Sequence, residues 1–142
     1  MANLVNSFSI KARDFAKAGE NSLQIQSLLK SIGFEPELIR RISICAYEAE
    51  MNAVMHGGDG ELLVTVDPKN IVLEVSDDGP GIKDVKLALR EGYSTATPEH
   101  REMGFGAGMG LPNINKNADS LAIDSSDGRG TRLRIKFKVG DG

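Results

Sequence analysis

The stretch from Tyr47 to Gly57 constrains the fold more than any other, because it places polar side chains within an otherwise apolar segment. Residues three or four apart share a helix face, so Glu48 and Asn52 form a pair and His56 follows one turn later. Two apolar stripes, about 120° apart at helical spacing, comprise Ile44, Cys45, Met51 and Met55, and Ile42, Ala46, Ala49 and Ala53. Such a helix is expected to be buried, and its carboxylate and amide then need partners from the protein or from a ligand.

The composition argues against several functional classes. The chain of 142 residues has 17 Lys and Arg against 20 Asp and Glu, a mildly acidic balance that gives no case for binding nucleic acid or an anionic membrane. Its one cysteine allows no intrachain disulfide, and its two histidines give no zinc-site spacing. Neither a charged-then-apolar leader nor an apolar run of about 18 residues is present, which predicts a cytoplasmic protein.

The hydrophobic pattern predicts a strand, two helices, a hairpin, a short helix, a loop, another short helix and a closing hairpin. The corresponding ranges are 5–13, 14–32, 36–56, 61–66 with 70–76, 83–90, 91–110, 111 onward, and 120–125 with 131–139. Asp14 is expected to cap the first helix and Gly33 to end it. This order is typical of an α+β two-layer sandwich.

Asp77, Gly79 and Gly81 follow the second strand of the first predicted hairpin. An aspartate there can accept a hydrogen bond from an exocyclic amine, and glycines let the backbone approach a planar ring closely. The same residues, with Pro80 between the glycines, also make a good tight turn. On these residues alone, ligand binding and a tight turn are equally good interpretations.

The span 91–110 contains no convincing regular element and ends in alternate glycines, Gly104, Gly106, Gly108 and Gly110. A structureless stretch of about 20 residues inside a compact domain is uncommon and is often a lid or binding loop. Backbone amides followed by a helix N-terminus bind phosphates readily. The run matches neither the phosphate-loop sequence nor the dinucleotide fingerprint, and alone it could be a flexible linker.

Together these features are the parts of an ATP site: a turn aspartate for the base, a glycine-rich lid for the phosphates and a helical asparagine for Mg²⁺. In this order the sequence resembles the GHKL, or Bergerat-fold, ATPases. The matching motifs are Glu48-x-x-x-Asn52-Ala53-x-x-His56-Gly57 (N box), Asp77-x-Gly79-x-Gly81-Ile82 (G1 box), Gly104 to Leu111 (G2 box) and Gly130-Thr131 (G3 position). The resemblance implies a two-layer α/β sandwich with a mixed, mostly antiparallel sheet and helices on one face. It also implies a single ATP-binding kinase domain over 1–142 with an ATP lid at about 91–110.

The resemblance implies a role for each matching residue. Glu48 would be the general base toward a serine or threonine hydroxyl, and Asn52 would ligate Mg²⁺. Asp77 would recognise the adenine amine with help from Thr131. Arg101 would reach the γ-phosphate, although a solvated loop arginine is the simpler interpretation. The other nucleotide-binding candidates are Gly79, Gly81, Ile82, Ser94, Thr95, Gly104, Gly106, Ala107, Gly108, Met109, Gly110 and Leu111.

Three residues near these motifs have simpler interpretations. His56 is expected to pack or hydrogen-bond within the N box rather than to ligate a metal, and Cys45 to be a buried thiol. Tyr93 is expected to anchor the lid or to stack on a base or partner.

Within the GHKL group, the short chain is similar to the bacterial anti-sigma factor and switch-protein serine kinase branch. Glu91-Gly92-Tyr93-Ser94-Thr95 and the glycine run are similar to stressosome-type kinases, which phosphorylate small STAS-domain antagonists. The resemblance therefore implies an ATP- and Mg²⁺-dependent serine/threonine kinase acting on such a regulator. Two alternatives are an anti-sigma factor that mainly sequesters a sigma factor and a nucleotide sensor with negligible turnover. An edge strand and amphipathic helix in residues 1–35 would also permit a homodimer or a docked partner.

Overall fold

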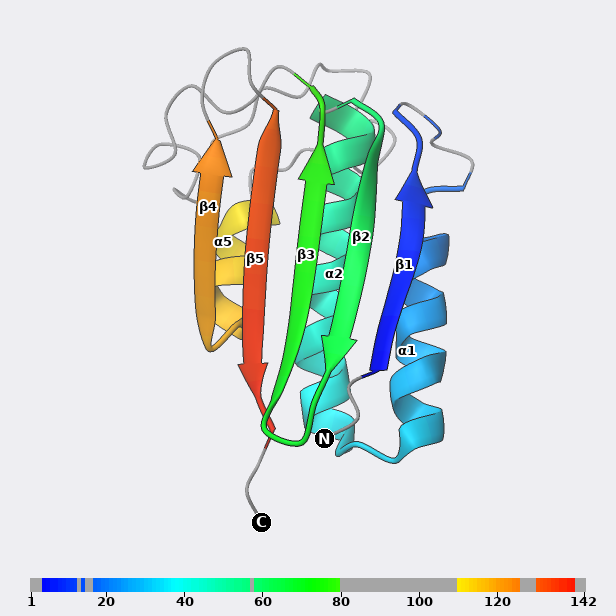
Figure 1. Cartoon of the computed structure of the whole chain (residues 1–142), viewed down its shortest axis with the longest axis vertical. Helices are drawn as coiled ribbons and strands as arrows, with labels where there is room; N and C mark the ends of the chain where they lie inside the picture. Colours follow the sequence, from blue (N-terminus) through cyan, green and yellow to red (C-terminus); the bar gives the residue numbers. More distant parts are fainter. Residues whose placement is uncertain are drawn as a thin grey trace.

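The computed structural model describes residues 4–12, 14, 17–56, 58–79, 110–125 and 130–139. In these residues a five-stranded sheet carries three helices on one face, so the predicted α+β two-layer sandwich is confirmed (Figure 1). The elements in chain order are β1 (Leu4–Ile10), α1 (Glu20–Ile32), α2 (Pro36–His56), β2 (Gly60–Val66), β3 (Asn70–Asp77), α5 (Gly110–Asn117), β4 (Ser120–Ser125) and β5 (Thr131–Lys138).

The strands follow the order β1-β2-β3-β5-β4, with β3 at the centre. Every pairing among the described strands is antiparallel, whereas the resemblance implied a mixed sheet. β5 inserts between β3 and β4, so the last residue of β3, Asp77, lies opposite the first residue of β5, Thr131. Two segments far apart in sequence therefore meet at one end of the sheet.

The core lies between the sheet and α2, which runs behind the central strands (Figure 1). Leu73 of β3 and Ile135 of β5 face each other in the register and are fully buried. On α2, the predicted second stripe of Ile42, Ala46, Ala49 and Ala53 is buried, and so are Cys45, Met51 and Met55 of the first stripe. The expectation that this helix is largely buried is therefore confirmed.

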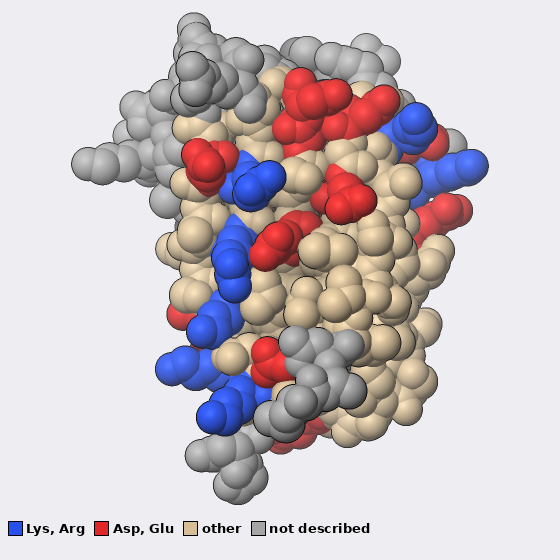
Figure 2. Space-filling model, viewed as in Figure 1, with Lys and Arg blue, Asp and Glu red and all other residues tan. Residues whose placement is uncertain are grey.

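The opposite face of the sheet has no helix over it in the described part of the chain (Figure 1). Alternate residues of β5 point to this face because successive side chains of a strand point to opposite sides. These residues are Arg132, Arg134, Lys136 and Lys138, and Figure 2 shows basic side chains in a column along this part of the sheet. Arg134 pairs with Glu74 of β3 at 3.7 Å, so acidic side chains on neighbouring strands offset part of the column's charge.

The first helix begins later than predicted. Asp14 does not cap it; α1 begins at Glu20, with Gly19 as its N-cap residue at φ 94°. A glycine in the left-handed region interrupts the helical path, and residues 17–19 form a turn instead. The predicted end is confirmed, since Gly33 adopts φ 101° and its N–H donates to the Leu29 carbonyl at 3.1 Å.

No helix in the described part of the chain combines the length and hydropathy needed to cross a bilayer.

Candidate functional site

One end of the sheet gathers the described candidate residues. The C-terminal half of α2, the ends of β3 and β4 and the starts of β5 and α5 all lie there (Figure 1). This grouping follows from topology, because antiparallel β3 and β5 place the end of one strand beside the start of the other.

Glu48 is half-buried on α2, and its side chain faces the first turn of α5. The Asn113 Nδ2 atom donates a hydrogen bond to the Glu48 Oε2 atom at 3.3 Å. A Cβ atom built on Gly110 would lie 3.8 Å from the same oxygen. Burial raises the pKa of Glu48, and the hydrogen bond from Asn113 acts in the opposite direction. The structure therefore gives this carboxylate a raised pKa and a fixed orientation, both of which suit a general base.

Asn52 lies one turn after Glu48 on α2 and is also partly exposed. Residues four apart on a helix point to the same face, so the amide and the carboxylate are neighbours on the helix surface.

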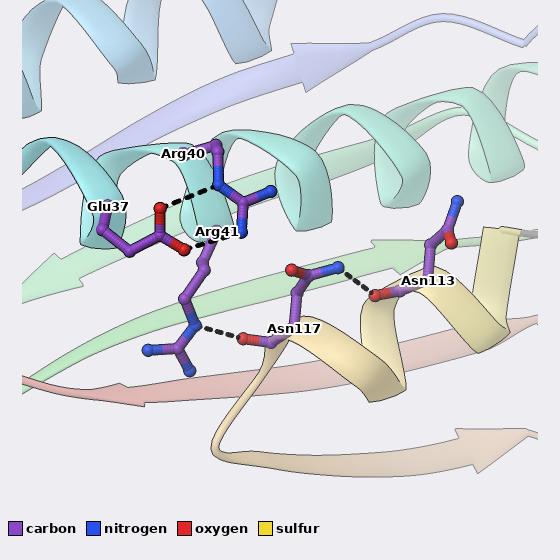
Figure 3. A network of polar contacts seen from close by, with 5 residues as sticks. All are labelled: Glu37, Arg40, Arg41, Asn113 and Asn117. Atoms are coloured by element: carbon purple, nitrogen blue, oxygen red, sulfur yellow. Dashed lines mark hydrogen bonds and ion pairs between the residues drawn. The ribbon is translucent and has the colours of Figure 1, made fainter.

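Polar contacts hold α5 against α2 at both ends, and Figure 3 shows those near its C-terminal end. Near the end of α5, the Arg41 Nε atom donates to the Asn117 carbonyl at 2.9 Å, and the Arg41 guanidinium pairs with Asp119 at 3.3 Å. The Asn117 side-chain amide donates to the Asn113 carbonyl at 2.9 Å. A cation at a helix C-terminus satisfies carbonyls that have no partner within the helix. Arg41 thus fixes the end of α5 while Asn113 reaches Glu48 near its start.

Asp77 forms the second part of the site, at the end of β3. Its Oδ1 atom accepts a hydrogen bond from the Gly79 N–H at 2.9 Å, as expected for an aspartate that organises a turn. Burial raises the pKa of Asp77, while hydrogen bonds from the backbone N–H groups of Gly79 and Gly58 act in the opposite direction. The turn interpretation and the ligand interpretation are compatible here, because a carboxylate can accept several hydrogen bonds.

Gly130 and Thr131 bring β5 close to Asp77. Gly130 is buried at φ 75°, and a Cβ atom at this position would collide with the Asp77 carbonyl oxygen. The Ser125 Oγ atom donates to the Gly130 carbonyl at 2.9 Å and is hydrogen-bonded to the Thr131 Oγ1 atom at 2.9 Å. Glycine at position 130 therefore permits the close approach that sets Thr131 directly opposite Asp77.

The structure places two more predicted residues. Leu111 is buried in the core beneath this end of the sheet. The Cys45 thiol is fully buried, which confirms the expectation of a buried thiol. That burial raises its pKa to about 12, and the thiol contacts the Ile114 carbonyl at 3.6 Å.

Several predictions fall outside the described residues. They concern the helix at 83–90, the lid at 91–110 apart from Gly110, and the His56 side chain. The individual candidates in this group are Gly81, Ile82, Tyr93, Ser94, Thr95, Arg101, Gly104, Gly106, Ala107, Gly108 and Met109.

Sequence reasoning missed two residues that contact candidate site residues and a third, Glu50, whose contacts join α1 to α2. Asn113 contacts Glu48 from 65 residues away, Ser125 contacts Thr131, and Glu50 accepts hydrogen bonds from Ser22. Glu50 lies between Glu48 and Asn52 with nothing nearby in the sequence to mark its partner, and no local pattern marks Asn113 or Ser125. These hydrogen bonds depend on how the helices and strands pack against one another, so the sequence alone does not predict them.

Comparison with protein families decides the chain's classification. Residues 37–141 match the family described as histidine kinase-, DNA gyrase B- and HSP90-like ATPases. The chain belongs to this family. The match spans α2 through β5 and therefore includes Glu48, Asn52, Asp77 and Thr131.

Among individual relatives, this ATPase-family chain is similar to bacterial regulators. It is 30% identical over 109 residues to the anti-sigma F factor of Thermoanaerobacter sp. (strain X514), covering 73% of each chain. It is 32% identical over 109 residues to the anti-sigma F factor of Clostridium novyi (strain NT), covering 72% of this chain and 73% of the relative. It is 26% identical over 113 residues to the serine/threonine-protein kinase RsbT of Bacillus subtilis (strain 168), covering 77% and 79%. The predicted branch of the family is thereby supported.

Proposed function

We propose that this chain is an ATP- and Mg²⁺-dependent serine/threonine protein kinase that phosphorylates a small STAS-domain regulator of the anti-sigma-antagonist type. The observation that carries the proposal is the Glu48 carboxylate, half-buried, oriented by Asn113 at 3.3 Å and one helical turn from Asn52. In this proposal the chain acts as a single domain.

Glu48 would take the proton from the substrate hydroxyl. Burial raises the pKa of this carboxylate, which makes it a stronger base than an exposed glutamate. Asn113 donates to Oε2 and so orients the carboxylate, whose remaining lone pairs could accept the proton of the incoming serine or threonine. Positioning and neutralisation of charge account for most of the catalysis in phosphoryl transfer, so one oriented carboxylate is enough on the acceptor side.

The described residues fit an adenine nucleotide. At the end of β3, the Asp77 carboxylate can accept hydrogen bonds from an exocyclic amine, and Thr131 stands opposite in the register. Bound Mg²⁺·ATP would supply the phosphoryl group. The Asn52 carbonyl oxygen is the kind of ligand that Mg²⁺ accepts, with phosphates and water completing its shell.

A single protein ligand, the Asn52 amide oxygen, would be enough to hold Mg²⁺ when ATP phosphates supply the other ligands. Among the described residues, no three His, Cys, Asp or Glu side chains are grouped to hold a metal ion. Mg²⁺ commonly binds through one or two protein oxygens together with substrate phosphates, and Asn52 matches that mode.

The test is transfer of labelled phosphate from ATP to a cognate STAS-domain protein. Glu48→Ala should reduce transfer by about 10²–10⁴-fold while leaving ATP affinity nearly unchanged, since a general base acts on the acceptor. Asn52→Ala should instead weaken Mg²⁺·ATP binding. A matched control is Glu74→Ala, which removes a carboxylate from the uncovered face of the sheet. Normal transfer by Glu48→Ala would exclude Glu48 as the base, and similar losses of ATP affinity in Glu48→Ala and Asn52→Ala would give Glu48 a structural role.

A second candidate function is sequestration of a sigma factor, with kinase activity secondary. It is favoured by the similarity to proteins named anti-sigma F factor. Co-purification from the native cell distinguishes the two: a stable complex with a sigma factor supports sequestration, and a STAS-domain protein that becomes phosphorylated supports the kinase.

A further inference from the structure

Ser125 is the last residue of β4 and contacts two groups at the start of β5. Its Oγ atom donates to the Gly130 carbonyl at 2.9 Å, and it lies 2.9 Å from the Thr131 Oγ1 atom in a second hydrogen bond. Ser125 and Thr131 are also paired in the β4–β5 register. A side chain on the edge strand therefore controls the surroundings of the Thr131 hydroxyl.

The two bonds together set the direction of the hydrogen bond between the hydroxyls. A hydroxyl has one hydrogen to donate and two lone pairs to accept with, whereas a carbonyl oxygen can only accept. The bond to Gly130 therefore uses the Ser125 hydrogen. The bond between Ser125 and Thr131 then needs the hydrogen of Thr131. With its only hydrogen directed at Ser125, Thr131 presents lone pairs to its remaining surroundings.

Asp77, opposite Thr131 in the β3–β5 register, also presents acceptors. Its Oδ1 atom already receives the Gly79 N–H at 2.9 Å, and an ionised carboxylate has no hydrogen to donate. The buried Gly130 permits the close approach of the two strands that puts these side chains side by side on the helix-covered face. The Asp77 and Thr131 side chains thus form a pair of hydrogen-bond acceptors, and neither has a hydrogen to donate to a ligand.

A pair of acceptors discriminates between purines at one position. Adenine carries an amino group at C6, which donates, whereas guanine and hypoxanthine carry a carbonyl oxygen, which accepts. A keto purine would place its oxygen against the lone pairs of Asp77 and Thr131. Sites built to satisfy one hydrogen-bonding group reject an analogue that leaves their polar groups unpaired.

We propose that Ser125 is a positioning residue that holds the Thr131 hydroxyl as an acceptor and so contributes to the choice of adenine over keto purines. This proposal rests on the nucleotide site described under the proposed function. Ser125 acts through Thr131 and need not touch the nucleotide itself.

The experiment measures the dissociation constants of Mg²⁺ complexes of ATP and inosine triphosphate by equilibrium binding. Inosine triphosphate replaces the C6 amine by a carbonyl and keeps the ribose and phosphates. Ser125→Ala frees the Thr131 hydroxyl to rotate and donate, so the preference for ATP should fall by about tenfold, mainly through weaker ATP binding and stronger binding of inosine triphosphate. Ser125→Thr, which keeps the hydroxyl, should retain most of the preference.

Ser120→Ala is the matched control, because Ser120 is an exposed serine at the other end of the same strand. It should leave the preference unchanged. Thr131→Val removes the controlled hydroxyl and should reduce the preference as much as Ser125→Ala does. In the Thr131→Val background, Ser125→Ala should have no further effect, which a purely structural role would not produce.

The outcomes distinguish the role of Ser125 from the existence of the nucleotide site. An equal weakening of both nucleotides by Ser125→Ala, or an effect that persists in the Thr131→Val background, would show that Ser125 only supports the fold. If Ser125→Ala binds ATP tightly and keeps its preference for ATP over inosine triphosphate, the role of Ser125 is overturned, while the nucleotide site itself stands. Failure of the unaltered chain to bind ATP in the presence of Mg²⁺ would overturn the nucleotide site itself.

Discussion

At the residue scale, burial of the Glu48 carboxylate would favour its proposed role as a base and at the same time lower stability at neutral pH. Its pKa is raised by burial, so folding favours the protonated form. The stability associated with that form is therefore fully present below the unfolded-state pKa and is lost as the pH rises through the higher folded-state pKa. Active-site groups often reduce stability in this way.

Glu48→Gln should accordingly abolish phosphoryl transfer yet stabilise the fold at neutral pH. A gain of about 1 kcal/mol, or roughly 3–5 °C in Tm, is expected because glutamine cannot ionise and can still accept from Asn113. Thermal unfolding at pH 8 and at pH 4 measures the effect. The gain should shrink at the lower pH; an equal gain at both values would show that ionisation of Glu48 is not its cause.

Asn113 offers a second test at this scale, through the pH dependence of transfer. Its hydrogen bond lowers the pKa of Glu48 against the larger effect of burial. Asn113→Ala should shift the acidic limb of kcat to higher pH and reduce transfer at neutral pH by about tenfold, the equivalent of one lost hydrogen bond. Asn117→Ala is the control, because it removes a bond to the Asn113 carbonyl and leaves the Glu48 contact in place. An unshifted acidic limb in Asn113→Ala would contradict the positioning role.

At the scale of elements, Glu50 joins α1 to α2. It is 3% exposed, and its carboxylate accepts hydrogen bonds from the Ser22 N–H at 3.1 Å, the Ser22 hydroxyl at 2.8 Å and the Asn21 N–H at 3.4 Å. The N-cap residue of α1, Gly19, has no side chain to serve these N–H groups. A negative charge from α2 therefore caps the positive end of the α1 dipole.

Glu50→Ala should cost about 2–3 kcal/mol in the free energy of unfolding, since it leaves buried donors of Ser22 without an acceptor. Urea denaturation followed by circular dichroism measures this cost. Glu50→Gln keeps an acceptor oxygen and should lose clearly less. Glu37→Ala, which removes an exposed ion pair with Arg40, should change stability little. Comparable losses in the Glu50 and Glu37 variants would contradict the capping role.

At the scale of the whole molecule, both layers depend on a single core. Ile135 is fully buried on β5, facing Leu73 on one side and Leu121 on the other. Ile135→Ala should cost about 2–5 kcal/mol and Ile135→Val about 0.5–1.5 kcal/mol, because the residual cavity grows with the volume removed. Denaturant unfolding measured by circular dichroism and by loss of nucleotide binding should give one coincident transition in each variant. Equal costs in the two variants would argue against close packing around Ile135.

The sequence alone determined the fold class, most element boundaries and the separate parts of the candidate site. Hydrophobic periodicity is local, so α2 and the two hairpins were predicted within one or two residues. The start of α1 was predicted wrongly at Asp14, because Gly19 enters the left-handed region and the cap comes from Glu50, on another helix. A cap supplied from a distant element leaves no local signature.

Only the tertiary structure decided which side chains meet. Asn113 reaches Glu48 across 65 residues of sequence, and the Ser22–Glu50 bond spans 28. Thr131 stands opposite Asp77 because β5 inserts beside β3 and Gly130 allows the strands to approach. Such contacts depend on strand register and helix packing, which arise from the whole core rather than from neighbours in the chain. The sequence therefore named candidate residues for the site, whereas the hydrogen bonds and pKa shifts of those in the described part of the chain followed only from the assembled fold.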